Sequence, residues 1–327
     1  MSEFVESFPF TFCSIGAHAG SYAGKGAADC QADGMWGRTP DVQPRGLRQA
    51  GHRQNGRGEL RRSLMRDLHS LDTERVMAGM VGLLALCEHM SEKPERLRPA
   101  FPKMGRTGQG GQSGQRPRDV LHAFGGRPLN CVEAPGLYAI LADISRRAGL
   151  AHTPELFLLP CEGMNAYALG DPEDACISVT RELLRRLSRE EIAGILAHEV
   201  AHILHRDSGA MRWAFAIQRE IADLVRRGIG DLMTRCQDFV RIGFQALLLA
   251  AAPVMAELLI AALSRVRELA ADARAMDLID HPKALVAALC KLEYFHTGLM
   301  PSHAHLGQNA HALHSHPGTW ERISFLA

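Results

Sequence analysis

His198-Glu199-Val200-Ala201-His202 is the most informative segment of this 327-residue sequence. It belongs to an apolar pattern of helical period that follows the capping-box sequence Ser188-Arg-Glu-Glu191. Side chains four residues apart project from the same face of a helix, so both imidazoles can reach one metal ion. Glu199 points to the side of this pair, where a carboxylate can accept a proton from a water held by the metal. The spacing therefore predicts a helix that carries a zinc site.

A catalytic zinc site needs a third protein ligand, which we expect to be a carboxylate or a histidine on another helix. Glu268 and Asp272 are one turn apart on one face of a later predicted helix. Glu268 could bind zinc while Asp272 holds a ligand histidine through its second ring nitrogen. Two alternatives stay open. These acids could be solvated partners of neighbouring arginines, and the His-Glu-x-x-His pattern could have arisen by chance among 16 histidines.

The residues around the zinc helix predict a compact, mainly helical α+β unit. An amphipathic helix is expected at 135–148. Three strands are expected at 156–159, 165–169 and 176–180, separated by Pro, Gly and Asp in the manner of hairpin turns. Upstream, the segment 105–115 has the composition of a flexible linker, because its glycines leave the backbone entropy unopposed by side-chain burial.

The N-terminal region is basic and lacks a sustained apolar period. Between Gly37 and Asp67 there are eight arginines against only Asp41 and Glu59, which predicts a solvated tail. Contact with nucleic acid or anionic lipid is the alternative, and we assign no nucleic-acid partner. A first helix is expected from a cap at Asp72 to about residue 90. The predicted organisation is an irregular basic arm (1–70), a short helix with a Gly-, Gln- and Arg-rich linker (71–127), and the α+β domain (128–327).

The cysteines and the first residues bear on the compartment. Eight cysteines without a Cys-x-x-Cys pair indicate neither a redox motif nor a cysteine zinc site, and they fit a reducing environment. The first twenty residues lack the positive n-region and the unbroken apolar stretch of a secretory signal. We therefore expect a cytoplasmic protein.

Four motifs in this order resemble HtpX-type zinc metallopeptidases, which are relatives of the CAAX prenyl endopeptidases. Besides the zinc-helix motif they are Glu268-x-x-x-Asp272, the segment 163–170 (Gly-Met-Asn-Ala-Tyr-Ala-Leu-Gly) and the segment 316–323 (His-Pro-Gly-Thr-Trp-Glu-Arg-Ile). The likeness covers residues 128–327. It implies a zincin-like domain with a small β-sheet beside the zinc helix.

The resemblance also implies roles for single residues. His198, His202 and Glu268 would hold one zinc ion per chain, Glu199 would be the general base, and Asp272 would support a ligand histidine. Asn165 and Ala166 match the strand that lines the cleft and pairs with an extended peptide, whereas a plain hairpin strand is the alternative. His316 and Arg322 could stabilise a developing oxyanion.

The expected activity is hydrolysis of peptide bonds in extended or unfolded polypeptides, and the resemblance suggests a role in protein quality control. One alternative is a catalytically silent zinc-binding or chaperone-like interaction protein. Another is a zinc hydrolase that acts on amides other than peptides. An intact Glu199 argues against the silent protein.

The segment 242–263 raises the question of a membrane. HtpX-type proteins have two membrane spans near the N-terminus and two between the zinc helix and the third ligand, whereas this sequence has one long apolar stretch, interrupted by Gln245, Pro253 and Glu257. A single crossing would put His202 and Glu268 on opposite sides of the bilayer. We therefore expect a buried helix, or a hairpin bent at 251–253 whose halves are too short to span. Shallow insertion at the cytoplasmic face of a membrane is the alternative.

Overall fold

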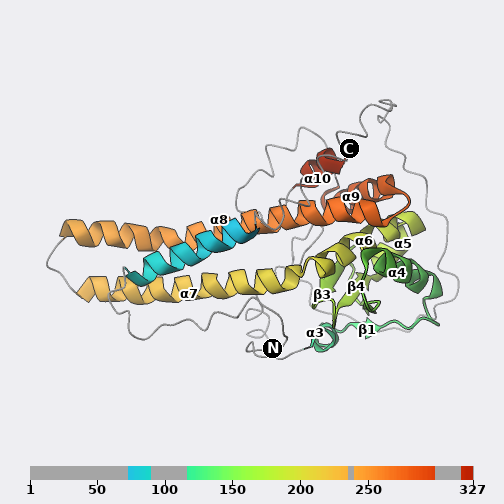
Figure 1. Ribbon diagram of the computed structural model, residues 1–327, viewed down its shortest axis with the longest axis horizontal. Coiled ribbons are helices and arrows are strands. Elements are labelled where there is room, and N and C mark those ends of the chain that lie inside the picture. The colour runs from blue at the N-terminus through green and yellow to red at the C-terminus, as the bar shows by residue number, and fades with distance from the viewer. Residues whose placement is uncertain (1–72, 90–115, 235–238, 299–317, 327) are drawn as a thin grey trace.

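The computed structural model describes residues 73–89, 116–234, 239–298 and 318–326. A helix covers residues 73–89. The elements that follow are α3 (Pro117–Ala123), β1 (Arg127–Pro128), α4 (Pro135–Ala148), β2 (Glu155–Leu159), β3 (Ala166–Leu169), β4 (Cys176–Thr180), α5 (Arg181–Arg186), α6 (Arg189–Leu204), α7 (Asp207–Thr234), α8 (Phe239–Leu278), α9 (Pro282–Thr297) and α10 (Thr319–Leu326). The fold is thus α+β and mainly helical, with a compact part around a small sheet and three long helices that project from it (Figure 1).

The sheet has the strand order β1-β2-β4-β3. The three predicted strands are present within about one residue of their expected ends. The expectation of successive hairpins is wrong for the first pair, because β2 pairs in parallel with β4, and only β3 and β4 form an antiparallel hairpin. Every residue of β4 is buried, so this strand takes the central position and leaves β3 at an edge.

Helix α6 lies at the centre of the compact part, where it packs against β3 of the sheet and against helices α4, α8 and α9 (Figure 1). Its predicted capping box is confirmed: Ser188 Oγ accepts the N–H of Glu191, and the Glu191 carboxylate accepts the N–H of Ser188 at 2.7 Å. Lys291 on α9 donates to the same carboxylate at 2.8 Å. The start of the metal-site helix is therefore fixed both locally and by a neighbouring helix.

The three projecting helices, hereafter the three-helix extension, are residues 73–89, α7 and the first half of α8. They share a core of their own that includes Met80, Ile221 and Ala256, all fully buried. The helix expected from residue 72 to about 90 is therefore confirmed. The hairpin expected at 251–253 is wrong, because α8 continues through Pro253. Buried contacts of Leu249, Ala252 and Ile260 hold this stretch against the other two helices.

One face of α8 remains uncovered within the described residues, so the expectation of a buried helix holds for only part of its surface. Large apolar side chains that are exposed there are Leu247, Val254, Met255 and Leu258. Among the described residues, one helical segment, Ala246–Leu278, is long and apolar enough to cross a membrane by length and composition, and 33% of its most apolar window is buried. Soluble core helices can meet the same criterion.

Helix α3 lies in the region that was expected to be linker, yet it packs on the sheet. Val120 and Leu121 form a small cluster with Phe157, Leu169 and Cys176. The packed domain therefore starts near residue 117 rather than at 128. The basic arm at 1–70 and the glycine-rich segment 105–115 lie outside the described residues.

Gly194 offers a test of the packing of α6 on α9. A Cβ atom at this position would come within 2.9 Å of Leu285 Cα, which is backbone and cannot turn aside. We expect Gly194→Ala to lower the free energy of unfolding by about 1–3 kcal/mol, as overpacking does. Gly136→Ala on α4 is the matched control, because nothing lies within 4 Å of its added Cβ. Urea unfolding followed by circular dichroism measures both. Equal stability of the two variants would contradict the close approach.

Candidate metal centre

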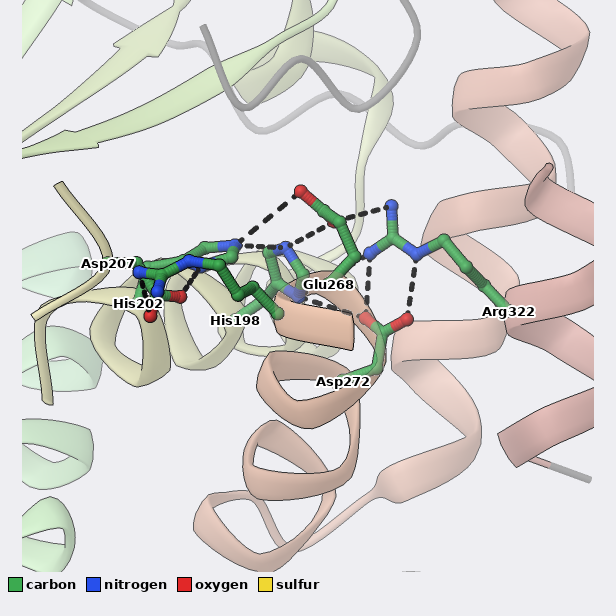
Figure 2. Close-up of polar contacts among 7 residues, drawn as sticks. His198, His202, Asp207, Glu268, Asp272 and Arg322 are labelled. Carbon is green, nitrogen blue, oxygen red and sulfur yellow. Dashed lines mark hydrogen bonds and ion pairs between the residues drawn. The ribbon is translucent and has the colours of Figure 1, made fainter. Parts of the chain in front are cut away.

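Helix α6 presents His198 and His202 on one face, in the interior of the protein. Their exposed fractions are 0% and 5%, and their Nε2 atoms lie 3.0 Å apart (Figure 2). A tetrahedral zinc ion about 2.0–2.1 Å from each nitrogen would hold them about 3.3 Å apart. The two rings therefore already have nearly the spacing that a shared ion requires.

Helix α8 brings Glu268 to the same point, although it lies 66 positions after His202 in the sequence. Glu268 Oε2 is 3.4 Å from His198 Nε2, and Oε1 is 3.8 Å from His202 Nε2. One potential ligand atom from each of these three residues lies within 4.8 Å of the others. The predicted third ligand therefore meets the two histidines, and the set of two imidazoles and one carboxylate suits zinc.

Asp272 lies one turn beyond Glu268 and contacts the second nitrogen of His198. Its Oδ1 is 2.9 Å from His198 Nδ1, and both of its oxygens accept hydrogen bonds of 2.7 Å from Arg322 on α10 (Figure 2). With Nδ1 as the donor, the lone pair of Nε2 faces the other two ligands. Burial raises the pKa of Asp272, but Arg322 and then His198 outweigh it and hold this pKa below its usual range.

His202 has an equivalent partner that the sequence analysis missed. Asp207, the first residue of α7, places Oδ2 2.5 Å from His202 Nδ1, and its Oδ1 forms an ion pair with Arg267. The available signal was an acid five residues after a ligand histidine. That spacing does not put two residues on one helix face, so only the turn between α6 and α7 brings them together.

The centre carries a surplus of buried negative charge. Four buried carboxylates lie around the two histidines, and two buried guanidinium groups pair with them: Glu199, Asp207, Glu268 and Asp272, and Arg267 and Arg322. With both histidines neutral and all four carboxylates ionised, as in a metal-bound site, two negative charges would remain, which is the charge that a divalent cation neutralises. Burial alone lowers the pKa of His198, but Asp272 and Glu268 outweigh it and raise this pKa to about 10. The residues present therefore fit a bound metal ion.

Glu199 lies beside the ligands and is fully buried. Burial raises its pKa, His198 and His202 lower it, and Glu268 raises it again. Neither carboxylate oxygen makes a hydrogen bond of normal geometry to another described residue, although the backbone N–H of Ala168 on β3 is near enough to lower the pKa. A buried acid without a firm partner is free to exchange a proton with a molecule held at the centre.

Asn165 and Ala166 lie at the start of the edge strand β3. The carbonyl of Asn165 accepts the N–H of Thr180 at 3.0 Å, so in an antiparallel ladder residues 166 and 168 turn their N–H and C=O groups away from β4. The Asn165 side chain bridges this edge: its Oδ1 accepts the N–H of Ala166 at 3.0 Å, and its Nδ2 donates to the Tyr167 hydroxyl at 2.5 Å.

The two residues suggested for oxyanion stabilisation have different outcomes. Arg322 reaches the centre, but two of its nitrogens bind Asp272, while Nη1 lies 3.4 Å from Glu268 Oε2. In this structure its firmest contacts therefore orient Asp272. His316 lies outside the described residues.

Comparisons with known proteins show to which family this chain is similar. The model of peptidase family M48 matches residues 133–327. A protease HtpX homolog of Thermococcus kodakarensis is 40% identical over 182 residues, which are 54% of this chain and 62% of that protein. The protease HtpX of Legionella pneumophila is 33% identical over 227 residues, which are 63% of this chain and 80% of that protein.

A further relative and one solved structure also match. A protease HtpX homolog of Aquifex aeolicus is 33% identical over 229 residues, which are 63% of this chain and 76% of that protein. The crystal structure of S. mikatae Ste24p aligns with a TM-score of 0.44 and 19% identity, over 84% of this chain and 63% of that one. This chain spans only 62% of the Thermococcus relative. The family match covers more than half of the chain, and the chain therefore belongs to peptidase family M48, among the HtpX-like metallopeptidases.

Proposed function

We propose that this protein is a zinc-dependent endopeptidase. The observation that carries the proposal is the convergence of His198, His202 and Glu268 from two helices, with Glu199 buried beside them. Its relatives are named proteases, and a His₂–carboxylate set with a neighbouring glutamate is typical of zinc hydrolases. A silent zinc-binding protein would have no use for a buried glutamate without a firm partner.

In the proposed reaction the protein holds a polypeptide against the centre and moves one proton. Zinc, when bound, would lower the pKa of a water molecule and polarise the carbonyl of the scissile bond. Glu199 accepts the proton of the attacking water and later delivers it to the leaving amine. Burial raises the pKa of Glu199, which makes its carboxylate a stronger base than a glutamate in water. Asp272 and Arg322 keep His198 in the tautomer that leaves Nε2 free.

The edge strand β3 supports an extended or unfolded polypeptide as the substrate. An extended peptide can pair with the outward N–H and C=O groups of residues 166 and 168. Because the N–H of Ala168 is close to Glu199, a peptide on this edge would run past the proposed general base. The side chain of Asn165 would release the Ala166 N–H and become available to the peptide.

Glu199→Gln tests the catalytic role. Glutamine has nearly the same shape but cannot accept the proton, so we expect proteolysis to fall by about 10²- to 10⁴-fold. Zinc content should stay at the wild-type level, because Glu199 is not a ligand in this proposal. Cleavage of casein, with and without a chelator, measures the effect. Full activity in the variant would rule out Glu199 as the base, and wild-type hydrolysis of small amides but not of casein would favour an amidase.

Glu268→Ala tests the third ligand. We expect zinc in the purified wild-type protein at about one ion per chain and a large loss in the variant, because two imidazoles alone hold zinc weakly. Metal analysis after dialysis gives the numbers. Glu220→Ala, an acid on the three-helix extension, is the control and should keep its zinc. Wild-type zinc content in Glu268→Ala would mean that another residue completes the site.

We also propose that the three-helix extension contacts the cytoplasmic face of a membrane. The support is the exposed apolar face of α8, where Leu247, Val254 and Leu258 are 66%, 51% and 38% exposed. Burying such side chains in a bilayer surface is favourable, and arginines on the neighbouring α7, such as Arg219 and Arg227, would favour anionic lipid.

Flotation with anionic lipid vesicles tests the membrane proposal. We expect the wild-type protein to float and the triple variant Leu247→Ser, Val254→Ser, Leu258→Ser to remain at the bottom of the gradient. Val132→Ser removes a still more exposed apolar side chain from the compact part and should float like the wild type. If the triple variant floats equally well, the α8 face is not the contact.

A further inference from the structure

A second pair of buried opposite charges lies behind the metal centre, on the side opposite Asp272 and Arg322. Asp207 and Arg267 are 4% and 3% exposed and form an ion pair. Removing two charges from water costs about as much as their attraction returns, so a buried pair is poor evidence of stabilisation. This pair contacts a candidate ligand, because Asp207 Oδ2 is 2.5 Å from His202 Nδ1 (Figure 2).

The backbone immediately before Asp207 has an unusual conformation. Arg206 has a φ of 55°, which is a left-handed backbone conformation that residues other than glycine rarely adopt. The turn ends α6 and directs α7 so that its first residue faces back to His202. Glu173 of the β3–β4 turn holds Arg206 in place through an ion pair. The strained backbone at Arg206 thus allows the carboxylate of Asp207 to reach Nδ1 of His202.

We propose that Asp207 and Arg267 are positioning residues of the metal site. Asp207 keeps the proton of His202 on Nδ1 and leaves Nε2 as the ligand atom, and Arg267 holds the Asp207 carboxylate in the orientation that this contact requires. Asp207 begins α7 and Arg267 directly precedes Glu268 on α8, so the pair also ties the three-helix extension to the metal site. This inference rests on the proposed metal-binding function.

The substitution Asp207→Asn has a specific predicted consequence. The new amide oxygen would face Arg267, which can only donate, and the NH₂ group would then point at His202 Nδ1. That arrangement favours the tautomer with the proton on Nε2. A protonated Nε2 has no lone pair to offer to the metal. Adding Arg267→Met removes the demand on the amide oxygen, so the amide can turn and accept the Nδ1 proton. The double variant should therefore bind metal better than the single one.

The experiment measures zinc affinity of the full chain by competition with a chromogenic chelator. We expect Asp207→Asn to weaken binding about 10- to 100-fold and the double variant to recover part of the loss. The visible absorption of the Co²⁺-loaded protein should shift in Asp207→Asn, which a merely structural role would not cause. Asp272→Asn is the positive control. Asp223→Asn, an exposed acid of α7 paired with Arg226, should bind like the wild type.

The outcomes separate this inference from the proposed function. If the wild type binds no zinc, the proposed function fails and the inference falls with it. If the wild type binds zinc and Asp272→Asn weakens it, but Asp207→Asn stays within about twofold of the wild type, only the inference is overturned. If Asp207→Asn does not fold, the pair Asp207→Ala, Arg267→Met decides, because it leaves no unpaired buried charge and no side-chain acceptor for the Nδ1 proton of His202: wild-type affinity in it overturns the inference, and weakened affinity supports it.

Discussion

Charge buried without compensation is costly, and this constraint explains how the structure is arranged around its centre. Glu199, Asp207, Glu268 and Asp272 are each at most 4% exposed. When these four carboxylates are ionised and the two histidines are neutral, two arginines compensate for half of the charge, and a divalent cation among the carboxylates and imidazoles would compensate for the rest. Helices α6, α7, α8 and α10 each supply the centre with a candidate ligand, a carboxylate behind a ligand or a compensating guanidinium group.

The need to bring His202 and Glu268 together also explains the path of the chain between them. The chain leaves the centre after His202 and must return to it at Glu268, and α7 and α8 provide this path by running out and back. One apolar face of each of these helices packs against the other and against the helix at 73–89, which gives the three-helix extension its own core, while a second face of α8 stays exposed. Asp207 and Arg267 lie where the two helices meet the centre, so the anchoring of the extension and the support of His202 are the same contact.

The metal-site helix and its motif could be predicted because their signals are local. A capping box, an apolar period and two histidines four residues apart are all set within one helix. The strands were likewise visible as short apolar segments between turn residues. Strand β1, with two residues, carries no such signal and was missed. The hairpin at 251–253 was wrong because proline is a local signal, and the packing of Leu249, Ala252 and Ile260 outweighs it.

The sequence by itself therefore determined the helix that carries His198, Glu199 and His202, and it singled out Glu268 and Asp272 as candidates, because spacing along one helix decides which side chains share a face. Only the tertiary structure decided the order of the strands, the continuity of α8, and the pairing of His202 with Asp207 and Arg267. Each of these depends on segments distant in the sequence, or on a turn that reverses direction, coming together to bury charge and apolar surface. These contacts stabilise the protein only in the folded state, where the distant segments lie together.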